Sequence, residues 1–74
     1  MTTMRRYQYA YAVIDPALGD MCIRVEDTTL NCDEDPNYTQ INPYSGEYLF
    51  KYYDRATGKW FYDQEHTQEW TPPV

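Results

Sequence analysis

The sequence has few of the residues that catalysis or metal binding requires. It contains one histidine, His66, and two cysteines, Cys22 and Cys32. A nucleophile and general base need a histidine that a third group orients, whereas His66 lies in a polar segment. Two cysteines and one distant histidine do not make a zinc site. The three glycines are scattered, so no phosphate-binding loop is present. We therefore expect a protein that is not an enzyme and binds no metal or cofactor.

Basic residues and long apolar stretches are also scarce. Six lysines and arginines stand against twelve acidic residues, which gives a net charge of −6. This excess of negative charge argues against direct binding to nucleic acid or to an anionic membrane. No apolar stretch follows Arg5 and Arg6 as a secretion signal would require, and none has the length of a transmembrane helix. We expect a cytoplasmic origin, in which Cys22 and Cys32 stay free thiols rather than pair.

Helical periodicity is absent, and short alternating segments separated by turn residues take its place. Residues 7–14 and 21–26 alternate on either side of a turn that contains Pro16 and Gly19, which predicts a first hairpin. Residues 38–42 predict a short third strand, and Ser45 can cap a single helical turn over 46–49. The expected fold is all-β, a small antiparallel sheet of about five short strands built from two hairpins.

The second hairpin, residues 48–63, is the most distinctive part of the chain. The segment Asp54-Arg55-Ala56-Thr57-Gly58-Lys59 predicts a four-residue loop in which Gly58 takes a positive φ angle. The carboxylate of Asp54 should accept backbone N–H groups within the loop. A symmetrical loop then pairs Asp54 with Lys59, and the strand pairs follow from it: Tyr53 with Trp60, Tyr52 with Phe61, and Lys51 with Tyr62.

This pairing divides the hairpin into two faces. We assign the face with Phe50 and Phe61 to the core, because phenylalanine has no polar tip. The opposite face would then be a half-exposed aromatic patch around a lysine, a composition typical of protein contacts. The residues predicted to bind a partner are Lys51, Tyr53, Trp60 and Tyr62.

The remaining segments set the predicted boundaries of the domain. Residues 1–6 are expected to be a flexible N-terminus, residues 7–63 a single β domain, and residues 64–74 a polar tail. The tail ends in consecutive prolines, which are compatible only with an extended chain and could themselves be a ligand for a proline-binding groove. The loop from Asp27 to Asn37 is strongly acidic, but its spacing does not match an EF-hand, so we interpret it as a solvated loop.

Four segments together resemble small proteins encoded near the tail genes of bacteriophages and prophages. They are A-Y-A-V-I-D, I-R-V-E-D-T-T, P-N-Y-T-Q-I-N-P-Y and E-Y-L-F-K-Y-Y-D-R-A-T-G-K-W-F-Y-D, and the resemblance covers about residues 9–63. It implies a structural or tail-associated protein, associated with the virion, that assembles with itself or with a larger tail protein. It brings no known catalytic residues with it.

A second hypothesis comes from the charge alone. Five of the twelve acidic residues lie between Glu26 and Asp35. A small acidic protein can act as a regulator or inhibitor by docking on a basic, nucleic-acid-binding surface of another protein. In that case Asp33, Glu34 and Asp35 would make the contact.

Overall fold

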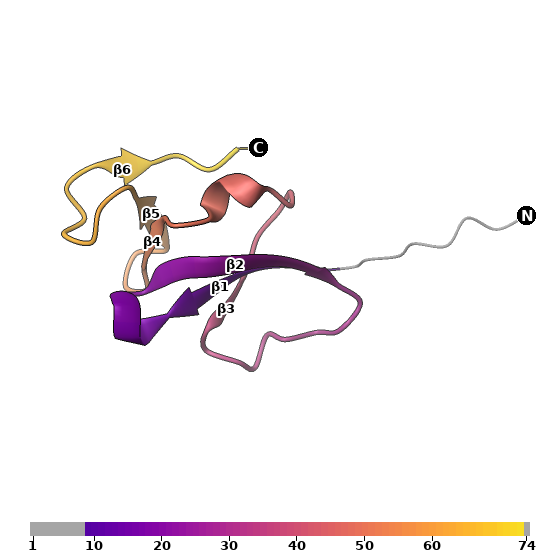
Figure 1. Ribbon diagram of the computed structural model, residues 1–74. Helices are drawn as coiled ribbons and strands as arrows, with labels where there is room; N and C mark the ends of the chain where they lie inside the picture. The colour runs from indigo at the N-terminus through magenta and orange to yellow at the C-terminus, as the bar shows by residue number, and fades with distance from the viewer. Residues whose placement is uncertain (1–8, 74) are drawn as a thin grey trace, which may run out of the picture.

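The computed structural model describes residues 9–73 as one open antiparallel sheet with the strand order β3-β1-β2-β4-β5-β6 (Figure 1). The elements are β1 (Tyr9–Asp15), η1 (Pro16–Leu18), β2 (Met21–Thr28), β3 (Tyr38–Gln40), η2 (Gly46–Tyr48), β4 (Tyr52–Asp54), β5 (Lys59–Phe61) and β6 (Glu69–Trp70). The all-β class is confirmed, and the described part of the chain has one strand more than expected. The predicted flexible N-terminus, residues 1–6, lies outside the described residues, as do residues 7, 8 and 74.

The first hairpin forms because its turn is stabilised locally. Strand β1 pairs with β2 from Tyr9 opposite Thr28 to Asp15 opposite Met21, with a shift of register between Val13 and Ile14. The Asp15 carboxylate accepts a hydrogen bond from the Ala17 N–H at 2.9 Å, and Gly19 closes the turn at φ 73°. Proline in the first turn of η1 and glycine after it fit their conformations at little cost.

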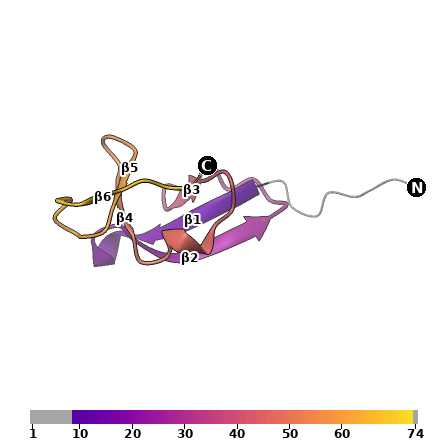
Figure 2. The same cartoon turned by 90° about the horizontal axis from the view of Figure 1, so that it is seen from above.

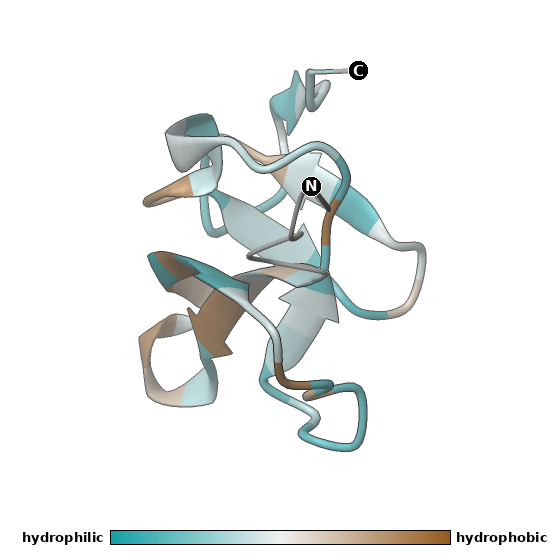
Figure 3. Cartoon of the chain, turned by 90° about the vertical axis from the view of Figure 1, so that its right-hand side faces the viewer, coloured by the Kyte–Doolittle hydropathy of each residue, from teal (hydrophilic) through white to brown (hydrophobic). Residues whose placement is uncertain are grey.

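The core lies on one face of the sheet, where the two hairpins meet. Its buried side chains come from both halves of the chain: Ala12, Ile14, Cys22, Ile41, Tyr48, Trp60 and Trp70. Tyr48 is its centre, because its ring makes edge contacts with Trp60 and Trp70 at centroid distances of 5.1 and 5.0 Å. Tyrosine and tryptophan rank near neutral in hydropathy, which is why strongly apolar colouring is confined to short stretches in Figure 3.

Tyr11 is buried on the opposite face, beneath the acidic loop. Its side chain is fully buried, and its ring makes an edge contact with Tyr38 at 5.5 Å. The hydroxyl donates to Asp33 Oδ1 at 2.8 Å and accepts from the Cys32 N–H at 2.9 Å. The loop that the sequence predicts to be solvated is therefore held at its middle by a buried tyrosine.

The end of the chain does not lie apart from the sheet as a tail would. Strand β6 pairs with β5, Trp60 lies opposite Trp70, and only 7% of Trp70 is exposed. The connection is held by Asp63, whose carboxylate accepts hydrogen bonds from the main chain of Thr67 and Gln68. The sheet thus continues past the predicted boundary at residue 63, because a second tryptophan is available to cover the first.

Candidate functional site

The predicted register of the second hairpin is confirmed next to its loop, where Tyr52 pairs with Phe61, Tyr53 with Trp60 and Asp54 with Lys59. The predicted pair of Lys51 with Tyr62 is not part of this ladder, which ends at Tyr52 and Phe61, because the Lys51 N–H donates to the Tyr48 carbonyl instead. Gly58 has a φ angle of 77°, and its N–H bonds to the Asp54 carbonyl at 2.7 Å. The local turn chemistry was sufficient to predict these contacts.

The assignment of the two faces is wrong. Trp60, placed in the exposed patch, is only 5% exposed, whereas Phe50, placed in the core, is 62% exposed. Tyr53 packs against Trp60 with ring centroids 4.8 Å apart, at the edge of the core. Phe61 lies on the other face, half-buried, and stacks on His66 at 4.5 Å.

Lys51 is the physical reason for this difference. A lysine in the middle of a face argues against burial of its neighbours, but the ammonium of Lys51 lies at the margin of the core rather than within it. Lys51 Nζ is 4.8 Å from the centroid of the Trp70 ring and 5.4 Å from that of Tyr62, and it donates to the Glu47 carbonyl at 2.9 Å. Cation–π contacts let a lysine stem cover apolar surface while its charge stays hydrated. Of the four predicted partner-binding residues, only Tyr62 is strongly exposed, at 54%.

Phe50 is the residue whose conformation is least expected. It has a φ angle of 69° without being glycine, and its N–H donates to the Cys22 carbonyl at 2.8 Å. The next residue, Lys51, offers its carbonyl to the Cys22 N–H, also at 2.8 Å. These two bonds hold an apolar ring outward in a conformation that costs about 1–2 kcal/mol for an L-residue. No sequence signal marks a phenylalanine for this conformation.

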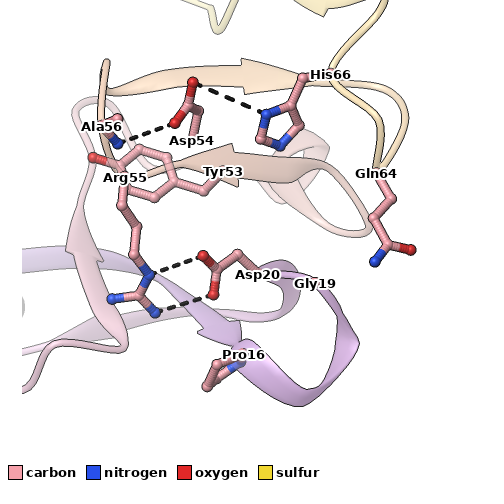
Figure 4. Close-up of a pocket in the computed structure, with 9 residues that line it drawn as sticks. All are labelled: Pro16, Gly19, Asp20, Tyr53, Asp54, Arg55, Ala56, Gln64 and His66. Atoms are coloured by element: carbon pink, nitrogen blue, oxygen red, sulfur yellow. Dashed lines mark hydrogen bonds and ion pairs between the residues drawn. The ribbon is translucent and has the colours of Figure 1, made fainter.

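An open hollow of about 490 Å³ lies between the two turns and the β5–β6 connection (Figure 4). Arg55 crosses it and binds Asp20 through two hydrogen bonds of 2.9 and 3.2 Å. The same guanidinium donates to the Pro36 carbonyl and to Asn37 Oδ1. Asp20 raises the pKa of Arg55. With its donors committed to the protein, this arginine ties three loops together rather than offering an anion site.

Asp54 and His66, at the rim of the hollow, also interact with neighbouring groups of the protein. The Asp54 carboxylate accepts from the Ala56 N–H at 3.0 Å and the Thr57 hydroxyl at 2.9 Å, and it lies 3.9 Å from His66 Nδ1. The hydroxyl of Thr57, followed by the Ala56 N–H, holds the pKa of Asp54 below its ordinary value. This arrangement stabilises the hairpin loop, and it does not place a nucleophile within reach of an oriented base.

The acidic loop presents Asp33, Glu34 and Asp35, all exposed. Asp33 accepts from Tyr11, and Asp35 Oδ1 accepts from the Asn37 N–H at 2.9 Å, so the loop has a defined shape. Within residues 9–73, no group of three potential ligand side chains gathers as a metal site would require. Both cysteines are free, Cys22 in the core and Cys32 half-buried in this loop.

In comparisons with protein-family models, curated proteins and solved structures, no match was found. No helix in the described part of the chain is long and apolar enough to cross a membrane. The features that sequence reasoning missed are the exposed Phe50, the buried Trp70 and the outer edge of β2.

Proposed function

We propose that this chain is a non-enzymatic protein that acts through contacts with other proteins. Following its resemblance to small proteins encoded near phage tail genes, the proposed role is structural or tail-associated in a bacteriophage or prophage. Its partner would be a larger tail protein or a second copy of the chain, and the protein would be associated with the virion.

The exposed ring of Phe50 carries this proposal. An apolar ring that is 62% exposed contributes little to the stability of the free domain, yet its backbone is held at φ 69°. Glycine or asparagine would adopt that conformation at lower cost. A strained residue that presents an aromatic side chain to solvent is typical of a binding surface. The main-chain bonds to Cys22 fix the backbone that carries the ring, which lowers the backbone entropy lost on binding.

The test is co-expression with the tail proteins encoded beside this chain, followed by affinity capture and by size-exclusion chromatography with light scattering. We expect a stable complex or a defined oligomer, which Phe50→Gly abolishes while the domain stays folded. Gln40→Ala, an exposed substitution on β3, is the matched control and should retain the complex. A strict monomer that captures no tail protein would refute the proposal.

The acidic loop supports a second candidate function. Asp33, Glu34 and Asp35 are exposed on a loop that Tyr11 holds in place, as expected of a regulator that docks on a basic surface. Capture of host DNA- or RNA-binding proteins at low salt, with nucleic acid as competitor, tests it. The complex should weaken as salt increases and should be lost in a variant with all three acids replaced by amides. Absence of any captured protein at low salt would eliminate this candidate.

A further inference from the structure

Within the described residues, the outer edge of β2 is only half covered. Strand β2 pairs with β1 from Met21 to Thr28, apart from a bulge at Ile23, but with β4 only at Met21, opposite Tyr52. Beyond that, the Cys22 main chain bonds to Phe50 and Lys51, and no other backbone hydrogen bond reaches this edge from residues 9–73. In Figure 2, no described segment runs along the outer side of the second half of β2. The open part begins where Phe50 ends the pairing.

The hydrogen bonds of β1 show which main-chain N–H and carbonyl groups of β2 point outward on this edge. The Ala10 carbonyl accepts from the Ile41 N–H and the Ile14 N–H donates to the Asn37 carbonyl, each at 2.9 Å, so these main-chain groups point away from β2. Main-chain direction alternates along an antiparallel pair. Ala10 lies opposite Asp27, and Ala12 lies opposite Val25. The N–H and carbonyl groups of Val25 and Asp27 are therefore directed outward, where a further strand would bind.

The side chains along this edge differ from one end to the other. Val25 is half-buried against the core. Ile23, two residues before it, and Phe50, whose main chain bonds to Cys22, are exposed. Asp27 is exposed, and its carboxylate has no hydrogen-bond or ion-pair partner within the described residues. Val25 and Asp27 share one face, because they are two residues apart in a strand. An added strand would meet an apolar position and, two residues along, a negative charge.

Charge and space argue against a second copy of the chain on this edge. A two-fold antiparallel pairing must match outward residues, which leaves three registers. In the register with Asp27 opposite Asp27 of the copy, two carboxylates face each other. In the register with Val25 opposite Asp27, Glu26 lies opposite Glu26 of the copy, so two carboxylates again face each other. Val25 opposite Val25 places Thr28 of the copy beside Cys22, where Phe50 already bonds. Acidic residues on an edge strand are a recognised defence against self-pairing.

We propose that the open edge of β2 binds an extended segment of another protein by strand addition, and that this segment carries an apolar residue and a lysine or arginine two positions apart. The apolar residue packs beside Val25 and Phe50, and the basic residue pairs with Asp27. Main-chain bonds to Val25 and Asp27 supply affinity, and the two side chains supply selectivity. This inference rests on the proposed function, since it specifies the chemistry of the protein partner.

The test uses a capped peptide, Thr-Val-Thr-Lys-Thr-Val-Thr, at millimolar concentration, and measures amide hydrogen exchange by NMR. We expect exchange at the Val25 and Asp27 amides to slow by about tenfold or more. Asp27→Pro removes one outward N–H without disturbing the β1 ladder, so it should stay folded and lose the effect. Asp27→Asn keeps the N–H and should weaken binding about two- to fivefold. A peptide with glutamate in place of lysine is the matched control.

Several outcomes would overturn the inference. If the glutamate peptide slows amide exchange as much as the lysine peptide, Asp27 does not select the basic residue. If the Asp27→Pro variant binds the lysine peptide as well as the unchanged protein does, the edge of β2 is not the binding site. Protection of the Val25 and Asp27 amides by raised protein concentration alone would identify a second copy as the occupant. Capture of tail proteins separates this inference from the proposed function: if Phe50→Gly loses the complex and Asp27→Pro keeps it, only the strand-addition site fails.

Discussion

Trp60 is the most buried side chain in the two strands of the second hairpin, β4 and β5. It is 5% exposed and contacts both Tyr48 and Tyr53. Trp60→Ala leaves a cavity the size of an indole, and we expect it to lower the free energy of unfolding by about 3–5 kcal/mol. Phe61→Ala, on the half-exposed face, should cost clearly less. Chemical denaturation of both variants measures this, and a larger loss for Phe61→Ala would contradict the structural assignment of the faces.

Phe50 should behave in the opposite way. Its strained φ angle of 69° brings no compensating burial, so Phe50→Gly is expected to stabilise the domain by about 1 kcal/mol. Phe50→Ala removes the ring but keeps a Cβ in the left-handed conformation, so it should not stabilise. Melting temperatures of the two variants separate relief of strain from loss of the ring. Destabilisation by glycine would mean that the ring contributes to folding.

At the scale of the elements, the loop of the second hairpin depends on Gly58. Its φ angle is 77°, and the nearest atom to an added Cβ is the Tyr53 hydroxyl at 3.9 Å, so space is not limiting. Gly58→Val should therefore destabilise the domain by about 1 kcal/mol or more through backbone strain alone. Gly46→Ala is the matched control, since Gly46 has no positive φ and open space around it. An unchanged melting temperature for Gly58→Val would refute the role of this turn.

The elements also show where sequence-based prediction stopped. Both hairpins, the capped turn at Ser45 and the register of Trp60 opposite Tyr53 could be predicted, because neighbouring residues determine them. The face of the second hairpin that is buried could not, since it depends on Trp70 returning to cover Trp60. The open edge of β2 could not be predicted either, because it depends on β4 pairing with β2 only at Met21.

For the whole molecule, acid should weaken the fold through two carboxylates. The Thr57 hydroxyl lowers the pKa of Asp54, and the Thr67 hydroxyl lowers that of Asp63, from an ordinary value of 3.8. Each folded-state pKa lies below the unfolded one, so this stabilisation is complete above about pH 5 and is lost as pH falls through the lowered values. Denaturation curves between about pH 2 and pH 5 measure the loss.

The Asp54→Asn/Asp63→Asn double variant provides the control for this pH dependence. It should be less stable at neutral pH, because the two amides accept weaker hydrogen bonds than carboxylates do. It should also lose less stability on acidification. A profile as steep as that of the unchanged protein would assign the acid sensitivity to other groups.

The position of Cys22 allows separation of the two halves of the sheet to be followed by the rate at which its thiol is labelled. Its main chain forms the bonds that join β2 to the second hairpin, and its side chain is fully buried. Burial also raises the pKa of the thiol, which keeps it in the unreactive protonated form. A thiol reagent should modify the half-buried Cys32 rapidly and Cys22 only when the halves separate. The slow labelling rate of Cys22 would therefore measure how often β2 separates from the second hairpin while the turn of each hairpin stays formed.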